Sequence, residues 1–309
     1  MAITPRKILV KKPDPEVVNQ SMMSLIRKVH GIVENADIEK QRHSQAQVGA
    51  LLGNTKDVRF TSVRIEDMDG EWVCVERAHM KKYVILYCHG GGYSTGSSIY
   101  ARTLTTKLAA STSMDVLSFD YRLAPENPYP AAFQDAMKAW NYLMLLGYGA
   151  RDIIVAGDSA GGNLALTLVL KLKEEGRILP RGLVLMSPWT DLTSSGKSHE
   201  TKAKLDPVLN TAYLERVIHD YAPEEDLKNP FISPIFGDFT GFPPTYIQVG
   251  ENEILLNDST MLQKRMAKEN VPVRLEICRG MWHVFQMSPL KTAYEAMEKN
   301  AEFIFEICR

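Results

Sequence analysis

The stretch Gly157-Asp158-Ser159-Ala160-Gly161 decides the fold of this chain. It follows a short, apolar and β-branched run at residues 152–156, which predicts a buried strand. It precedes residues 163–173, whose apolar side chains recur at helical spacing. A serine between two glycines at a strand-to-helix turn is typical of a nucleophile elbow, where flanking side chains would clash. On this motif alone, a glycine-rich turn that only packs a helix on a strand remains an alternative.

The composition of the chain is that of an ordinary globular protein. With 309 residues, 45% hydrophobic residues and a net charge of −1, it suits one large α/β domain and carries no electrostatic footprint for nucleic acid. No apolar run approaches the roughly 18 residues of a membrane span, so we expect no membrane insertion. The stretch Ile8-Leu9-Val10 is too short for a signal peptide. Four cysteines without paired spacing indicate packing rather than metal or redox chemistry, and predict a cytoplasmic protein.

Short apolar runs alternate with amphipathic segments along most of the chain. We expect strands at 83–88, 114–119, 182–186, 245–249 and 273–278, with helices at 99–111, 131–146, 257–269 and a last helix ending near Phe305. Residues 58–77 alternate apolar and polar residues around Asp69-Gly70, which predicts a hairpin. Alternating strands and helices predict an α/β fold with a mostly parallel sheet and helices on both faces.

Two segments depart from that alternation. Residues 16–52 are expected to be helical, with an apolar stripe suited to core or lid packing. Residues 190–240 are polar, contain Pro207, Pro223, Pro230 and Pro234, and are expected to hold one short helix near 213–221.

Serine needs a base to take its proton and a third group to orient that base. In the hydrolase order, the acid and then the histidine follow the serine. Three of the seven histidines follow Ser159, namely His199, His219 and His283. His283 lies just past the last predicted strand, where a loop can bring imidazole above the sheet. We therefore predict His283 as the base, since the other two fall in the irregular 190–240 segment.

Three carboxylates in the loop after strand 245–249 are candidates for the acid: Glu251, Glu253 and Asp258. Either a glutamate or an aspartate can hold the imidazole tautomer and stabilise imidazolium. Asp258 falls where the next helix begins, and a capping role would account for it without catalysis. We favour Glu253 and keep Asp258 as the alternative.

The run His89-Gly90-Gly91-Gly92 can supply the oxyanion hole. Backbone N–H groups must already point at the oxygen that gains charge, and consecutive glycines let the backbone approach closely. We predict Gly91, Gly92 and Ala160 as the donors, and His89 as a residue that holds the loop. A phosphate-binding loop is the rival interpretation, but no Gly-Lys-Ser/Thr follows.

Several motifs resemble the hormone-sensitive-lipase-like family of microbial carboxylesterases, across nearly the whole chain. They are His89 to Tyr93, Tyr121 to Glu126, Gly157 to Asn163, Ser187-Pro188-Trp189, Asp206-Pro207 and Asn229-Pro230. The resemblance implies an eight-stranded α/β-hydrolase core at 53–190 and 241–309. It also implies a helical cap built from residues 1–52 and 191–240, cofactor-free hydrolysis of short acyl esters, and frequent homodimers.

The resemblance also implies the roles given above to Ser159, His283 and the three oxyanion donors. Many members of the family carry Asp-Pro-Leu at the acid position. This chain has Glu253-Ile254-Leu255 there and resembles the branch with a glutamate acid.

The sequence thus predicts a serine carboxylesterase that prefers acetyl to hexanoyl esters and needs neither a cofactor nor a metal. Side chains expected to wall the substrate pocket are Met22, Met23, Tyr93, Trp189, Tyr213 and Trp282. An amidase, deacetylase or peptidase would use the same residues. A non-catalytic binding module, resembling the hydrolase-like plant hormone receptors, would usually lose the histidine that this chain keeps as His283.

Overall fold

Eight strands form a single sheet in the order β1-β2-β4-β3-β5-β6-β7-β8. The computed structural model describes residues 15–34, 36–53, 57–77 and 82–309; the expectation for Ile8-Leu9-Val10 lies outside them. The strands are β1 (Val58–Ile65), β2 (Met68–Val75), β3 (Val84–Cys88), β4 (Asp115–Phe119), β5 (Ile153–Asp158), β6 (Gly182–Met186), β7 (Thr245–Gly250) and β8 (Val273–Cys278). Pairs β1–β2 and β2–β4 are antiparallel, and the other pairs are parallel.

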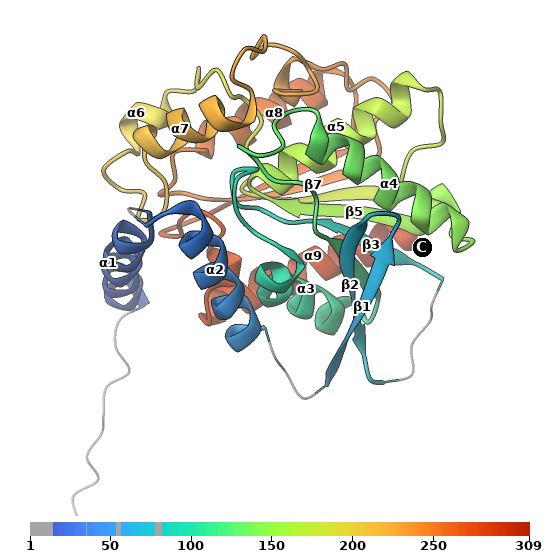
Figure 1. Cartoon of the computed structure of the whole chain (residues 1–309), viewed down its shortest axis with the longest axis horizontal. Coiled ribbons are helices and arrows are strands. Elements are labelled where there is room, and N and C mark those ends of the chain that lie inside the picture. The colour runs from blue at the N-terminus through green and yellow to red at the C-terminus, as the bar shows by residue number, and fades with distance from the viewer. Residues whose placement is uncertain (1–14, 35, 54–56, 78–81) are drawn as a thin grey trace, which may run out of the picture.

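The central strands are apolar along their whole length because both faces of the sheet are covered. Every residue of β3, β4, β5, β6 and β7 is buried, as expected for parallel strands under helices. Helices α3 (Ser98–Thr112) and α9 (Lys291–Cys308) lie below the sheet in Figure 1, and α4 (Ala131–Leu145), α5 (Ala160–Glu174) and α8 (Leu256–Lys268) lie above it. Each layer has its own apolar core.

The direction of the winding reverses at β3. From β3 the chain moves to β4 on one side, and then crosses to β5 on the other side of β3. In open α/β sheets, ligands bind at the carboxyl ends of the strands beside such a switch point. The loop after β3 holds the predicted oxyanion glycines, and the turn after β5 holds Ser159.

The two segments expected to form a cap lie toward the same end of the sheet, on the left in Figure 1. The first contains α1 (Pro15–Glu34) and α2 (Ile38–Leu52), and the second contains α6 (Ser198–Thr201), α7 (Thr211–Tyr221) and the short turn η2 (Pro234–Phe236). They contact each other, since a guanidinium nitrogen of Arg27 on α1 donates to the backbone oxygen of Leu205 (3.1 Å). The second segment holds more helix than the one predicted near 213–221.

The turn of the β1–β2 hairpin differs from the prediction. Ile65 pairs with Met68, so the two turn residues are Glu66 and Asp67 rather than Asp69-Gly70. Glu66 has φ 53°, the left-handed conformation that such two-residue turns require. Gly70 lies within β2 instead, where a Cβ atom would stand 2.9 Å from the backbone oxygen of Ser118 on β4. Close approach of a neighbouring strand therefore accounts for this glycine.

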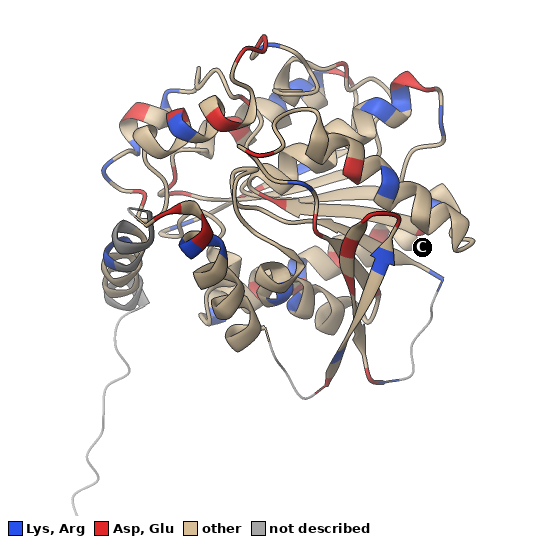
Figure 2. Cartoon of the chain, viewed as in Figure 1, with Lys and Arg blue, Asp and Glu red and all other residues tan. Residues whose placement is uncertain are grey.

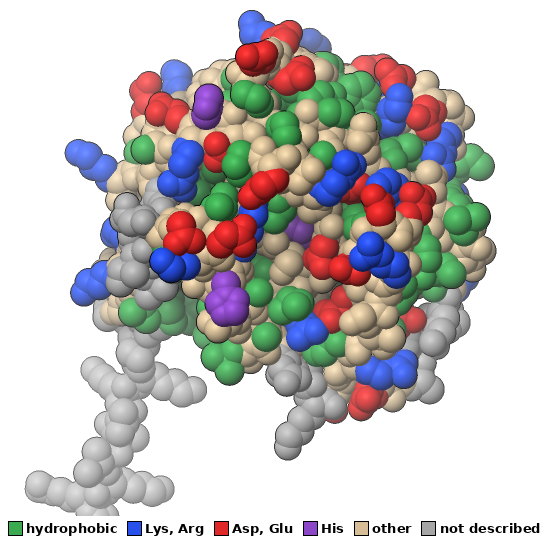
Figure 3. Space-filling model, in the orientation of Figure 1, with side chains coloured by type: hydrophobic (Ala, Val, Ile, Leu, Met, Phe, Trp, Pro, Cys, Tyr) green, Lys and Arg blue, Asp and Glu red, His purple; other side chains and the backbone are tan. Residues whose placement is uncertain are grey.

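Charged groups of both signs are interspersed over the molecule. Figure 2 shows Lys and Arg beside Asp and Glu along the same helices and loops, and Figure 3 shows the same mixture on the visible face. Among the described residues, no helix combines the length and apolar character needed to cross a membrane.

Candidate active site

Ser159 stands alone at the junction between β5 and α5, with φ 53° and ψ −121°. This conformation is strained for a residue with a side chain. The tight turn depends on its flanking glycines. A Cβ at Gly157 would lie 2.4 Å from the backbone oxygen of Gly161, and one at Gly161 would lie 2.1 Å from that of Cys88. The elbow geometry expected from the sequence is present, although α5 begins at Ala160, earlier than predicted.

The structure brings three of the predicted site residues together. Ser159 Oγ lies 3.0 Å from His283 Nε2, and His283 Nδ1 lies 3.2 Å from Glu253 Oε1. All three residues are buried. With the proton on Nδ1, His283 donates to the carboxylate and leaves Nε2 free to accept from the serine hydroxyl. This arrangement is the one a serine nucleophile needs.

The two other carboxylates considered for the acid point elsewhere. Glu251 accepts from the backbone N–H of Gly280 (2.9 Å). Asp258 faces His199 Nε2 (3.1 Å) with one oxygen. With the other it accepts from the backbone N–H groups of Thr190 (2.8 Å) and Asp191 (3.0 Å). The expected capping of its own helix by Asp258 is wrong, because α8 has Leu255 at its N-cap and no side-chain cap.

The glycines predicted to form the oxyanion hole have backbone N–H groups that are not paired among the described residues. Gly91 has φ 115°, a backbone conformation that side chains disfavour. Within the described part of the chain, the backbone N–H groups of Gly91, Gly92 and Ala160 have no hydrogen-bond partner. Ala160 is also the first residue of α5, where the free N–H groups and the helix dipole favour negative charge.

Asp158 connects this loop to the elbow, a contact that the sequence analysis missed. One of its oxygens accepts from the hydroxyl of Tyr87 (2.6 Å) and from the backbone N–H of Gly90 (2.9 Å). Burial raises the pKa of Asp158 to about 6. His89 stacks on Tyr121 at 4.0 Å, donates from Nδ1 to the backbone oxygen of Gly90 (2.8 Å), and is kept neutral because burial lowers its pKa to about 4.

The charges around His283 stabilise its protonated form relative to a free imidazole. Burial by itself lowers the pKa of His283, but the hydrogen bond and charge of Glu253 outweigh it, together with the charges of Asp206 and Asp158. The net pKa of His283 lies above its ordinary value of 6.5. Asp206 belongs to the Asp206-Pro207 motif, for which the sequence predicted no role in the site. It accepts from the backbone N–H of Ile254 (2.9 Å), next to Glu253, and burial raises its pKa to about 6.

The side chains expected to wall the pocket have different surroundings. Tyr93 is buried, stacks on Tyr221 at 3.8 Å and donates to Asn163 (2.7 Å), so packing accounts for it. Trp189 and Trp282 are also buried. Tyr213 is half-buried, and its hydroxyl lies 2.9 Å from where a Cβ on Gly92 would stand. Met22 and Met23 pack on the apolar cluster around Trp282. Their role toward substrate stays a prediction.

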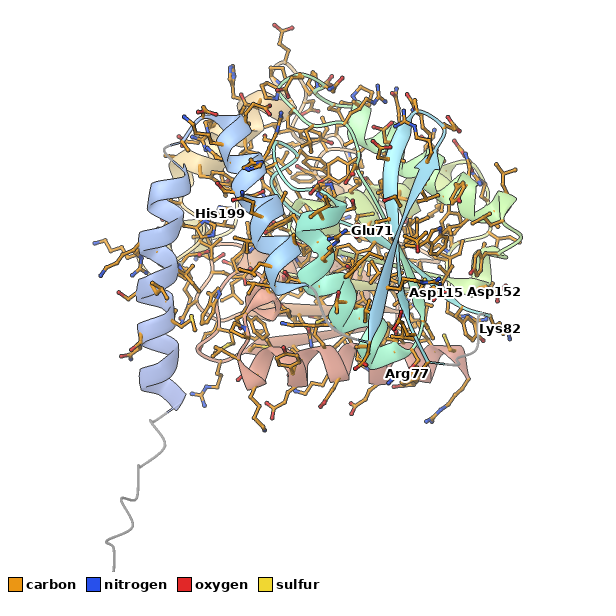
Figure 4. All side chains as sticks on the ribbon, turned by 60° about the horizontal axis from the view of Figure 1, so that its bottom comes forward. Glu71, Arg77, Lys82, Asp115, Asp152 and His199 are labelled. Carbon is orange, nitrogen blue, oxygen red and sulfur yellow. The ribbon has the colours of Figure 1, made fainter. Side chains whose placement is uncertain are left out.

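A broad cavity of about 720 Å³ lies elsewhere, beside the hairpin. Lys82, Asp115 and Asp152 on its wall are grouped near the strands in Figure 4, far from His199 of the insertion. Asp115 and Asp152 stand at the amino ends of β4 and β5, whereas the serine stands at a carboxyl end. This cavity is therefore separate from the serine–histidine–carboxylate group. No cluster of His, Cys, Asp and Glu suited to a metal ion is found in the described ranges.

A mostly parallel sheet wound in this order, with a serine elbow and a histidine–carboxylate pair at its carboxyl edge, defines an α/β hydrolase. Residues 85–287 match the alpha/beta hydrolase fold family. A hormone-sensitive lipase from a metagenome library has a solved structure with a TM-score of 0.89 and 35% identity, covering 97% of this chain and 100% of that one. The chain therefore belongs to the α/β-hydrolase fold family and to its hormone-sensitive-lipase-like members.

Two curated relatives agree with that placement. An esterase from Acinetobacter venetianus is 36% identical over 83% of this chain and 85% of its own length. An acetyl-hydrolase from Streptomyces hygroscopicus is 36% identical over 81% of this chain and 83% of its own length.

Proposed function

We propose that this protein is a serine carboxylesterase that hydrolyses short-chain acyl esters through an acyl-enzyme intermediate. The observation that carries the proposal is the continuous hydrogen-bonded path from Ser159 Oγ through His283 to Glu253, at 3.0 Å and 3.2 Å. The similarity of this chain to proteins named esterase and acetyl-hydrolase supports ester chemistry and a small acyl group.

In the first half of the reaction, Ser159 Oγ attacks the ester carbonyl carbon while His283 Nε2 takes the serine proton. The tetrahedral oxyanion accepts hydrogen bonds from the N–H groups of Gly91, Gly92 and Ala160. One such donor is typically worth about 3 kcal/mol of barrier. The carbon–oxygen bond to the alcohol then breaks, and His283 gives its proton to the departing alcohol.

In the second half, a water molecule attacks the acyl carbon and His283 takes its proton. The bond to Ser159 Oγ breaks, the carboxylic acid leaves, and the proton returns to the serine. Glu253 holds the proton of His283 on Nδ1 and stabilises the imidazolium that forms in each half. His283 thus carries each transferred proton, first from Ser159 to the alcohol and then from water to Ser159.

The test is labelling with a serine-directed phosphonate, followed by mapping of the modified residue. We expect a single adduct on Ser159. The variant Ser159→Ala should form no adduct, and its ester turnover should fall by about a million-fold. Thermal melting checks that this variant is folded. An active and labelled Ser159→Ala would overturn the mechanism. A matched ester and amide measured together separate an esterase from an amidase, deacetylase or peptidase.

Further parts of the proposal concern organisation. We propose a core at 53–190 and 241–309 under a cap of 1–52 and 191–240, supported by the contact between Arg27 and Leu205. We also propose a cytoplasmic protein without a nucleic-acid partner, supported by four cysteines without paired spacing and by the net charge of −1. A homodimer, implied by the family resemblance, is a proposal that size-exclusion with light scattering tests.

A further inference from the structure

Three residues around the site hold a backbone conformation that side chains disfavour. They are Ser159 (φ 53°), Ser187 (φ 49°) and Val284 (φ 49°). Such a conformation is a clear outlier for a β-branched residue like Val284. It persists only when surrounding contacts hold it, and it concentrates at functional sites. Ser159 is the proposed nucleophile and Val284 follows the proposed base, which leaves Ser187 without a role.

The hydroxyl of Ser187 joins the acid to the histidine loop. Ser187 Oγ donates to Glu253 Oε2 (2.8 Å) and accepts from the backbone N–H of Val284 (3.2 Å). One hydroxyl has one proton to donate and lone pairs to accept with, so both bonds form at once. Ser187 follows β6 directly, and its own backbone N–H donates to the oxygen of Gln248 on β7 (2.7 Å). The backbone that carries the hydroxyl is therefore held by the neighbouring strand.

Glu253 depends on few donors. Its carboxylate is fully buried, and within the described residues it accepts from three groups. His283 faces Oε1, while Ser187 and the backbone N–H of Gly250 (2.8 Å) both donate to Oε2. A charged group in such a place is held by its hydrogen bonds. With the hydrogen bond from Gly250 alone, the carboxylate could rotate about that hydrogen bond. Two donors on Oε2 instead direct Oε1 at the imidazole.

We propose that Ser187 is a positioning residue that aims Glu253 at His283 and ties the loop that carries His283 to β6. The inference rests on the proposed function, because it concerns how the same acid is held. The hydroxyl of Ser187 hydrogen-bonds Glu253 and the backbone of Val284, and in this proposal it acts through those two residues. Its hydroxyl orients the carboxylate and the imidazole in the way that outer hydrogen-bond partners orient the ligands of metal sites.

The test is a double-mutant cycle with a short-chain chromogenic ester. Ser187→Ala should lower kcat by about 10- to 100-fold, with KM changed by less than about threefold. Glu253→Ala should lower kcat far more. In the Glu253→Ala background, removing the Ser187 hydroxyl should change kcat by less than about twofold, because the group it orients is gone. A merely structural role would give the same fold-loss in both backgrounds.

Two further variants keep the outcome clear. Ser187→Gly also lacks the hydroxyl but adopts φ 49° without strain, so it should lose kcat as Ser187→Ala does, even where the alanine variant folds poorly. Thr245→Val removes another buried hydroxyl, which donates to the backbone oxygen of Pro243 (3.0 Å) at the opposite end of β7, and should keep wild-type kcat.

Full kcat in either Ser187 variant, or equal losses with and without Glu253, would overturn the inference while wild-type turnover and phosphonate labelling leave the esterase intact. A wild-type protein that neither turns over the ester nor takes the label would overturn the esterase itself, and the inference with it.

Discussion

His283 depends on groups that are far apart in the chain. Its serine partner is 124 residues away and its carboxylate partner is 30 residues away. Within the site, the two carboxylate oxygens of Glu253 have different hydrogen-bond partners. One faces the imidazole, and the other is held by Ser187 and Gly250. A rotation of this one carboxylate would therefore break its hydrogen bond to His283.

Two substitutions at the residue scale separate the candidate acids. Glu253→Gln should lower kcat by about 10⁴-fold, because the imidazolium loses its counter-charge and the tautomer its anchor. Asp258→Asn should keep kcat within about tenfold, since Asp258 faces His199 rather than His283. Its cost should fall on stability, at about 1–3 kcal/mol, because it lies in a buried hydrogen-bond network. Steady-state kinetics and urea unfolding of both variants measure this, and a crippled Asp258→Asn beside an active Glu253→Gln would reverse the assignment.

The pH dependence follows from the pKa of His283. A general base must be unprotonated, so kcat/KM rises as pH passes through the pKa of the free enzyme. Because Glu253 and its neighbours raise that pKa above 6.5, the acid limb should lie above pH 6.5. In Glu253→Gln the carboxylate charge that raises the pKa of His283 is lost, while burial still lowers that pKa. The acid limb of the profile should therefore move to lower pH. Profiles of kcat/KM with an uncharged ester measure both, and an unmoved limb would contradict the coupling.

The sequence could predict residues whose chemistry demands a particular type. Ser159, His283 and the glycine run are of that kind, and the structure brings Ser159, His283 and Glu253 within hydrogen-bond distance. Ser187, Asp158 and Asp206 could not be assigned roles, because their partners come from other strands and loops. The available signals were the motif positions themselves, such as Ser187-Pro188 directly after a predicted strand.

At the scale of elements, helix α2 is hydrogen-bonded to the loop that follows the proposed oxyanion glycines. Arg42 donates to the backbone oxygens of Ser94 and Ala124, each at 2.9 Å, and pairs with Glu126 at 2.7 Å. Gln45 accepts from the backbone N–H of Gly96 (3.0 Å). A planar guanidinium suits several acceptors at once. Arg42 therefore connects α2, a predicted cap helix, to the core through several hydrogen bonds.

Replacing Arg42 by Met keeps the aliphatic stem but removes those donors. We expect Arg42→Met to lower the free energy of unfolding by about 1–2 kcal/mol and to lower kcat/KM, because the loop beside Gly91 and Gly92 loses a support. The control is Arg64→Met, whose ion pair with Asp69 has both side chains largely exposed and should matter by less than about 0.5 kcal/mol. Urea unfolding with activity assays measures both. Equal effects in the two variants would refute the role of Arg42.

Element bounds show where prediction from sequence stops. Strands β6 and β8 were predicted at their observed residues, since apolar runs bounded by turn residues are a strong signal. The hairpin turn was misplaced because Gly70 resembles a turn residue, whereas it serves the close approach of β4. That requirement belongs to a neighbouring strand more than forty positions away, and the local pattern carries no trace of it.

At the scale of the whole molecule, the proposed cap segments lie toward one end of the sheet in Figure 1, and Ser159 follows the carboxyl end of β5. We propose that the cap covers the site. A covered site limits the length of the acyl chain it can admit. In a series of chromogenic esters, kcat/KM should be highest between acetyl and hexanoyl and fall for longer acids. A maximum at about ten carbons or more would show that the site is open to long chains and would contradict the proposed substrate class.

The apolar cluster of Met281, Trp282 and Phe285 includes side chains of α1, among them Met22, Met23 and Ile26. This cluster flanks His283 on both sides in sequence. A substitution that removes the apolar side chains of α1 would therefore weaken the packing that holds the backbone on either side of His283.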